Sequence, residues 1–174
     1  IPVFIDADPL TWNMVTNQIE DKITSRTKAI MAVHIYGLPV DMDPILSLAD
    51  KYGLIIIEDA AEAHGLHYNG RICGAIGDIS IFSFYPNKLI TTGEGGMIVT
   101  DDNSLAEKCR SLRNLCFQPG KRFIHEELGW NFRMTNMQAA LGLAQIERLD
   151  EFVEKKRYMG QKYTALLSGL DNIQ

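Results

Sequence analysis

The sequence predicts an α/β fold in which a mostly parallel β-sheet carries helices on both faces. Two segments, 28–34 and 54–57, are apolar without alternation, which is typical of parallel strands buried on both faces. Between them, Ile45, Ala49 and Tyr52 recur at the spacing of an amphipathic helix. Because strand, helix and strand follow one another, we expect right-handed crossovers, with ligands bound beyond the carboxyl ends of the strands.

The first half of the chain supplies the elements around this unit. A short strand is expected at 3–5 and a helix at 15–23, where isoleucines share one face. Asp43 before Pro44 is typical of a helix N-cap followed by proline at the first helical position. Gly53 is expected to end that helix in a left-handed conformation.

The second half predicts two more strands and a long helical region. Residues 78–84 are rich in β-branched and aromatic side chains, which predicts a strand. The strand at 97–100 follows too soon for a crossover helix, so we expect it to be antiparallel to 78–84. A helix is expected after residues 101–102. Thr135 and Gln138 form a capping box that starts a helix, which continues with a bend or break to about residue 167.

Composition and charge exclude several classes of protein. The chain has 174 residues, 46% of them hydrophobic, and a net charge of −5. A net negative charge gives no electrostatic attraction to nucleic acid or to an anionic membrane. No apolar run approaches the roughly 20 residues of a membrane span, so a cytoplasmic protein is expected. Cys73, Cys109 and Cys116 are scattered, which favours neither a disulfide framework nor a metal site.

Lys88 is the candidate for chemistry. It follows the strand at 78–84 and a turn at Pro86, so it is expected at the mouth of the sheet. A lysine in a partly dry loop has its charged form disfavoured, and its free amine attacks carbonyl groups to form Schiff bases. The alternative is an ordinary solvated turn lysine.

Several motifs together resemble one known family. They are EDAAEAHG at 58–65, GD at 77–78, FSFYPNK at 82–88, TGEGG at 92–96 and NFRM at 131–134. In order and spacing they resemble the pyridoxal-phosphate-dependent sugar aminotransferases of the DegT/DnrJ/EryC1/StrS family. Within that family, HIYG at 34–37, the glutamate at 62 and the run at 129–136 most resemble the branch of GDP-perosamine synthases.

The resemblance implies the fold and domain organisation. The fold would be the large domain of a fold-type I aminotransferase, bound to pyridoxal 5'-phosphate. Residues 1–174 would form part of that domain, and residues from about 150 to 174 would start a helical link toward a C-terminal small domain. A phosphate-wrapping loop and a ring-stacking aromatic lie upstream of residue 1 in relatives, so we expect the chain to be part of a longer polypeptide.

The resemblance also implies two central roles. Lys88 would form the Schiff base with the cofactor aldehyde and then carry the proton between substrate and cofactor carbons. Asp59 would keep the pyridine nitrogen protonated, which makes the ring an electron sink. The alternative for Asp59 is a cap for a helix over 60–64, and both roles can coexist.

Three further cofactor contacts are implied. Glu62 would face the ring hydroxyl, at a position where many relatives carry glutamine. Ser83 would donate to the phosphate, or simply belong to the polar face of a strand. Asn131 would reach the phosphate of a neighbouring subunit, which implies a homodimer with shared active sites, or it would be a turn asparagine. For His64 and Arg133, substrate contact and structural hydrogen bonding stay open.

The implied reaction moves an amino group from L-glutamate to a nucleotide-linked 4-keto-6-deoxy sugar, with a place in O-antigen and lipopolysaccharide biosynthesis. Two alternatives remain. The first is the sugar dehydratase branch of the family, which carries histidine in place of the reactive lysine, so Lys88 argues against it. The second is a truncated, inactive relative that serves as a binding or dimerisation chain.

Overall fold

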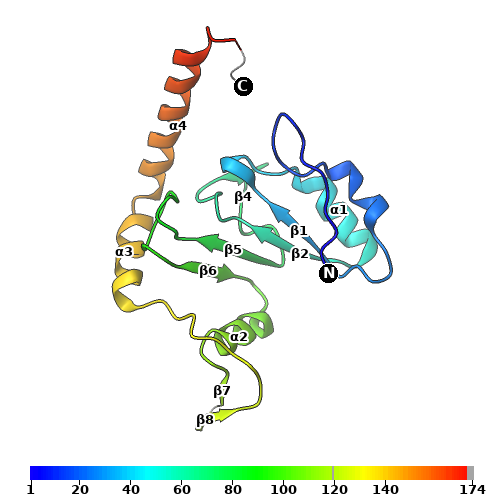
Figure 1. Cartoon of the computed structure of the whole chain (residues 1–174), viewed down its shortest axis with the longest axis vertical. Helices are drawn as coiled ribbons and strands as arrows, with labels where there is room; N and C mark the ends of the chain where they lie inside the picture. Colours follow the sequence, from blue (N-terminus) through cyan, green and yellow to red (C-terminus); the bar gives the residue numbers. More distant parts are fainter. Residues whose placement is uncertain (119, 172–174) are drawn as a thin grey trace.

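The computed structural model describes residues 1–118 and 120–171 and shows an α/β architecture (Figure 1). Its main sheet has the order β1-β2-β5-β6. β1 (Ala29–Val33), β2 (Ile55–Asp59) and β5 (Ile79–Ser83) are parallel, while β6 (Gly96–Val99) is antiparallel to β5. The predicted mostly parallel sheet and its antiparallel final strand are therefore confirmed.

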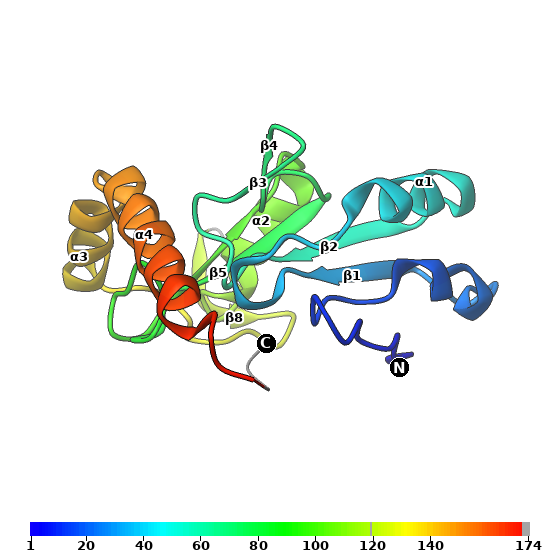
Figure 2. The ribbon, with the colours of Figure 1, turned by 90° about the horizontal axis from the view of Figure 1, so that it is seen from above.

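Helix α1 (Met42–Tyr52) covers one face of the sheet, as Figure 2 shows from above. It ends at Gly53, whose φ of 62° is left-handed, as predicted. The hydrophobic core lies between one face of β1 and β2 and the side of α1 that packs on it, together with residues next to α1 in the chain. Its buried members are Ile19, Ile30, Ala32, Val40, Met42, Ile45, Ala49, Leu54 and Ile56.

The start of α1 lies two residues earlier than predicted. Its N-cap is Asp41, and Pro44 occupies the third helical position rather than the first. Asp41 makes no side-chain capping bond, because its carboxylate accepts the hydroxyl of Tyr68 instead. Proline is tolerated anywhere in the first turn, where no intrahelical partner exists for its missing N–H.

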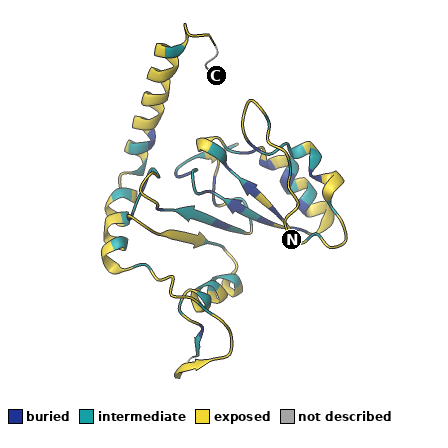
Figure 3. Cartoon of the chain, viewed as in Figure 1, coloured by how far each residue is buried: buried dark blue, intermediate teal, exposed yellow. Residues whose placement is uncertain are grey.

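Burial in β1 and β2 alternates along the strands, contrary to the expectation of burial on both faces. Ile30 and Ile56 are buried, whereas Met31 and Ile55 are 54% and 47% exposed (Figure 3). Successive side chains of a strand point to opposite faces, and α1 lies against one of them. Within the described residues, the second face of these two strands is open.

The N-terminal predictions are wrong in detail. Residues 3–5 form no strand, and the local pairing is an isolated bridge between Ala7 and Met14. The expected helix at 15–23 is two 3₁₀ turns, η1 (Thr16–Gln18) and η2 (Glu20–Lys22). Threonine, asparagine and valine are weak helix formers, which favours short turns over a continuous α-helix here.

Two small hairpins extend from the sheet. β3 (His67–Tyr68) pairs with β4 (Arg71–Ile72), and β7 (Phe117–Gln118) pairs with β8 (Lys121–His125). The side chain of Arg71 holds the first hairpin against the start of α1 through an ion pair with Asp43. This ion pair connects the β3–β4 hairpin, which follows β2, to α1, which precedes β2.

Three helices complete the fold. α2 (Asn103–Leu112) follows β6, and α3 (Asn136–Ile146) and α4 (Leu149–Leu167) stand at one end of the sheet (Figure 1). The predicted long helix with a break is confirmed. Of the predicted link at 150–174, residues 172–174 lie outside the described residues. No helix within 1–118 or 120–171 is long and apolar enough to cross a membrane.

Replacing Thr135 by alanine is expected to lower the free energy of unfolding by about 1 kcal/mol. The Thr135 hydroxyl accepts the amide of Gln138 at 3.2 Å, and the Gln138 side chain accepts the amide of Thr135 at 2.9 Å, so the variant loses one half of a capping box. Urea unfolding measures the change. Thr164→Ala in α4 is the matched control, because that hydroxyl bonds only to a carbonyl of its own helix. Equal effects in both variants would contradict the assigned role of the cap.

Candidate active site

The candidate site lies at the carboxyl edge of the parallel strands. Asp59 is the last residue of β2 and Ser83 the last residue of β5. Asp59 pairs in register with Ile81, and because side chains alternate, Asp59 and Ser83 face the same side of the sheet. The fold therefore directs a carboxylate and a hydroxyl from two neighbouring strands to one region.

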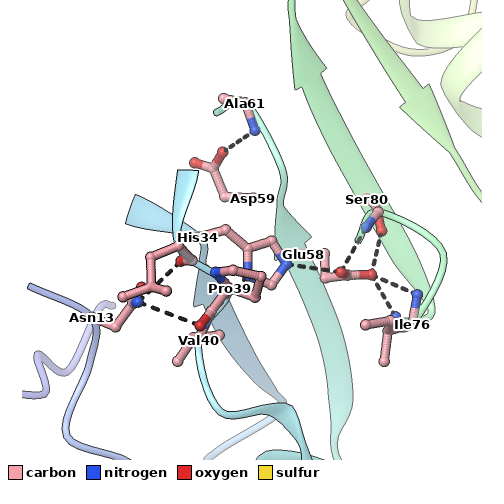
Figure 4. A network of polar contacts seen from close by, with 12 residues as sticks. Asn13, His34, Pro39, Val40, Glu58, Asp59, Ala61, Ile76 and Ser80 are labelled. Carbon is pink, nitrogen blue, oxygen red and sulfur yellow. Dashed lines mark hydrogen bonds and ion pairs between the residues drawn. The ribbon is translucent and has the colours of Figure 1, made fainter. Parts of the chain in front are cut away.

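Asp59 caps a turn rather than a helix. One carboxylate oxygen accepts the amide of Ala61 at 3.1 Å (Figure 4), and residues 60–64 form turns closed by the bond from the Ala63 amide to the Ala60 carbonyl. The expected helix over 60–64 is absent from the described chain. Among the described residues, the other oxygen of Asp59 accepts no hydrogen bond, so it is available to a ligand.

Lys88 and Glu62 are in direct contact. The lysine Nζ lies 2.8 Å from Glu62 Oε1, and the two side chains are only 17% and 32% exposed. The second oxygen, Oε2, accepts the amide of Tyr36 at 2.9 Å. The hydrogen bond from Lys88, followed by that from Tyr36, lowers the pKa of Glu62 below its ordinary value. Lys88 is therefore a partly buried, paired amine and not a solvated turn lysine.

Ser83 keeps its hydroxyl proton available. Its oxygen accepts the amide of Tyr85 at 3.3 Å, which fixes the start of the turn that leads to Lys88. The Lys88 amide in turn donates to the Tyr85 carbonyl at 3.0 Å. Ser83 and Lys88 are thus held by the same turn, with a hydroxyl donor and an amine on it.

Helix α3 braces the glycine-rich loop after Lys88. Gln145 accepts the amide of Thr91 at 3.1 Å and donates to its carbonyl at 2.7 Å, and Gln138 donates to the carbonyl of Glu94 at 2.9 Å. A side chain at Gly95 would place its first carbon 2.6 Å from a threonine hydroxyl of this loop, so glycine is required. Sequence reasoning missed the two glutamines, although their seven-residue spacing puts both on one helix face.

His64 is buried beside this turn. It is 6% exposed, its ring lies against Phe82 and Phe84 at centroid distances of 5.4 and 6.0 Å, and its Nε2 has no partner among the described residues. Burial lowers the pKa of His64, and the charge of Lys88 lowers it further. A neutral imidazole therefore lies close to the Lys88 amine.

Asn131 and Arg133 lie apart from this group. Asn131 forms a bridge with Asn114, whose side chain accepts Arg133 at 3.4 Å. A cavity of about 310 Å³ is lined by Asn131, Arg133, Met134, Thr135 and Asn136. This segment leads from β8 into α3 (Figure 1). Within one chain, the structure brings Lys88 against Glu62 and turns Asp59 and Ser83 to one face, but Asn131 does not join them.

Comparison with known proteins gives the family. The profile of the DegT/DnrJ/EryC1/StrS aminotransferase family matches residues 1–174. The chain belongs to this family. GDP-perosamine synthase of Caulobacter vibrioides is 50% identical over 171 residues, which is 98% of this chain and 46% of that relative. A putative pyridoxal phosphate-dependent aminotransferase of Bacillus subtilis, EpsN, is 43% identical over 180 residues, covering 100% of this chain and 46% of EpsN.

A solved structure of the family agrees in fold. The S. venezuelae DesV structure has a TM-score of 0.89 at 40% identity, over 97% of this chain and 45% of DesV. The chain spans about half the length of the curated relatives it matches. The predicted fold and family are confirmed.

Directly behind the site, this family member contains a buried histidine–glutamate hydrogen bond that sequence reasoning missed. His34 Nε2 lies 2.9 Å from Glu58 Oε2, and both side chains are 0% exposed (Figure 4). Glu58 is also reached by donors from the loop after β4 and from β5. They are the amides of Gly74 at 2.7 Å, Ile76 at 2.7 Å and Gly77 at 2.8 Å, and the hydroxyl of Ser80 at 3.1 Å.

These donors decide the charge of Glu58. Burial alone would raise the pKa of this carboxyl, but the hydrogen bonds, led by that from His34, outweigh burial and lower the pKa to about 2. The carboxylate is therefore ionised in the interior. The signal for it was a histidine and a glutamate at the ends of otherwise apolar strands, since a polar residue at such a position needs a partner.

Proposed function

We propose that this chain is part of a pyridoxal 5'-phosphate-dependent aminotransferase that transfers an amino group from L-glutamate to a nucleotide-linked 4-keto-6-deoxy sugar, as a GDP-perosamine synthase would. The observation that carries the proposal is the partly buried amine of Lys88, held 2.8 Å from Glu62 at the carboxyl edge of the sheet. The names of the relatives, a GDP-perosamine synthase and a pyridoxal phosphate-dependent aminotransferase, support it.

The residues at this edge fit pyridoxal phosphate. Lys88 is an amine that can react with an aldehyde, the free oxygen of Asp59 can accept a ring N–H, and Ser83 can donate to a phosphate. These are the three kinds of group that the cofactor requires from a protein. When bound, the cofactor supplies an electron-withdrawing ring that stabilises negative charge on the substrate carbon.

Each side chain then has a specific task. Lys88 Nζ would serve as the group that accepts the proton from the substrate carbon and returns it to the neighbouring carbon of the cofactor. Asp59 would accept the ring N–H and so keep the ring nitrogen protonated. Glu62 holds the lysine amine in place and would face the ring hydroxyl of the cofactor. His64 contributes a neutral imidazole that limits solvent access next to the amine.

The proposal includes the domain organisation and the assembly. Residues 1–174 form part of the large cofactor-binding domain, and α4 starts the link toward a small domain. Asn131 contacts the phosphate of a partner subunit in a homodimer with shared active sites, and its place on a cavity that Lys88 does not line agrees with this role. We place the enzyme in the cytoplasm, where it would supply amino sugars for O-antigen and lipopolysaccharide.

Borohydride reduction in the presence of pyridoxal phosphate tests this function. The peptide that contains Lys88 is expected to carry the cofactor mass, whereas Lys51, an exposed lysine paired with Glu20, is expected to stay unmodified. Adding L-glutamate is then expected to change the absorption of the bound cofactor as amino transfer begins. Folded protein that carries no label at Lys88 would favour the inactive chain, and a label without any response to glutamate would favour a chain that binds the cofactor without amino transfer.

A further inference from the structure

The carboxylate of Glu62 is held from two sides. Oε1 lies 2.8 Å from Lys88 Nζ, and Oε2 accepts the backbone amide of Tyr36 at 2.9 Å. A glutamate side chain has three rotatable bonds, so one contact alone would leave the carboxylate free to swing. The position of the Tyr36 amide therefore decides where Glu62 presents its charge to the lysine.

The Tyr36 amide belongs to a strained turn. Tyr36 has φ 52° and ψ 31°, a left-handed conformation, in the 3₁₀ turn η3 (Ile35–Gly37) that follows β1. For a residue with a side chain, this conformation is unfavourable and persists only where the surroundings enforce it. Something next to the turn must therefore hold it.

Two buried side chains hold the segment 35–40. Asn13, which is 4% exposed, accepts the amide of Ile35 at 3.1 Å and donates to the carbonyl of Leu38 at 3.0 Å. His34 Nδ1 accepts the amide of Val40 at 3.2 Å. Asn13 comes from the N-terminal loop and His34 from the end of β1, on either side of the segment (Figure 4).

The pair with Glu58 fixes the His34 ring itself. Since Nδ1 accepts a hydrogen bond, the ring carries its proton on Nε2 and donates it to Glu58 at 2.9 Å. Glu58 is anchored in turn by three backbone amides and a hydroxyl. The ring can neither flip nor rotate without breaking buried hydrogen bonds.

From these contacts we infer that Asn13 and His34 are positioning residues for Lys88. They clamp residues 35–40 so that the Tyr36 amide orients Glu62 against the amine. The inference rests on the proposed function only in taking Lys88 as the reactive group. His64 is a second titratable group near Lys88, since the charge of Lys88 lowers the pKa of the His64 imidazole.

The reactivity of Lys88 toward trace acetic anhydride tests the clamp on protein freed of cofactor. The contact with Glu62 holds the amine in a position where the lysine side chain is only 17% exposed, so losing the contact is expected to free the amine for the reagent and raise the acetylation rate. Glu62→Gln sets the full effect, expected to be roughly threefold to tenfold, as for a partly buried ion pair. Asn13→Ala and His34→Gln are each expected to raise the acetylation rate of Lys88 as well. On a logarithmic scale, each increase should be at least half of that seen in Glu62→Gln. His34→Gln can still donate to Glu58, so the buried carboxylate keeps a hydrogen-bond donor at this position.

Two internal comparisons make the result specific. Lys51 is acetylated in the same sample and is expected to keep its rate in every variant. Asn17→Ala, the same substitution at an exposed position of η1, is expected to leave Lys88 unchanged. General unfolding would raise both lysines together, and the ratio of the two rates removes that contribution.

The acetylation rates of Lys88 in the three variants decide whether the clamp exists. A rise at Lys88 in Glu62→Gln, Asn13→Ala and His34→Gln, with Lys51 constant, supports the clamp. A rise in Glu62→Gln alone overturns it, and so does the absence of any rise in Glu62→Gln, because the pair would then not control the amine. Labelling of Lys88 by pyridoxal phosphate and borohydride reports on the proposed function separately, so failure of one leaves the other measurable.

Discussion

Replacing Lys88 by arginine is expected to lower kcat for amino transfer by at least about 10³-fold, because the variant loses both the nucleophile and the proton carrier. A guanidinium stays protonated near neutral pH, so it can neither attack an aldehyde nor accept a proton. It can still pair with Glu62, which lies 2.8 Å from the lysine amine, so the fold is expected to be retained. The measurement is steady-state turnover with glutamate and a 4-keto nucleotide sugar.

Lys51→Arg is the matched control for this prediction. Lys51 is also paired with a glutamate, but it lies in α1 and is exposed, so its variant is expected to turn over at the wild-type rate. Borohydride labelling should disappear in Lys88→Arg and persist in Lys51→Arg. Turnover by Lys88→Arg within tenfold of wild type would remove Lys88 from the centre of the mechanism.

Much of the fold follows from local pattern. The apolar runs around Ile30 and Ile56, the glycine at 53 and the capping box at Thr135 each predict an element that the structure contains. The prediction of a strand at 3–5 was wrong. Three apolar residues form a strand only if a neighbouring strand pairs with them, and among the described residues none does. The prediction that β1 and β2 are buried on both faces was wrong. Such burial depends on which elements cover the sheet, and a strand's own residues do not encode that.

The candidate site was predictable in its residue types but not in its contacts. The motifs pointed to Lys88, Asp59 and Glu62, and the structure shows a contact between two of these, Lys88 and Glu62, that the motifs did not predict. The link from Tyr36 to Glu62 runs through a backbone amide, and every residue except proline carries one, so no residue type signals it. The same holds for the amides that surround Glu58.

Replacing Glu58 by alanine is expected to lower the free energy of unfolding by roughly 3–5 kcal/mol, as measured by urea unfolding at pH 7. The variant leaves His34 and four other buried or part-buried donors without their acceptor. Buried donors without partners are costly because water cannot replace the lost acceptor. A loss of this size is a large part of the roughly 5–15 kcal/mol that holds a typical domain together.

Glu20→Ala controls for the loss of a glutamate that makes hydrogen bonds. Glu20 accepts from Lys51 and Tyr52, both at 2.6 Å, but on the exposed surface, where water replaces the lost partner. Its unfolding is expected to stay close to wild type. If Glu58→Ala unfolds at the same urea concentration as Glu20→Ala, the buried network does not stabilise the fold.

The same carboxylate predicts how stability depends on acid. The pKa of Glu58 is lowered from 4.5 to about 2 in the folded state, so its stabilisation is fully present above pH 4.5 and is lost as the pH falls toward 2. The difference corresponds to roughly 3 kcal/mol. Glu58→Gln, which keeps the shape but does not titrate, is therefore expected to be less stable than wild type at pH 7, and the gap should narrow below pH 4.5. A gap that stays constant from pH 7 to pH 3 would mean that Glu58 is not the ionised centre of this network, because only a titrating group can make the two curves converge.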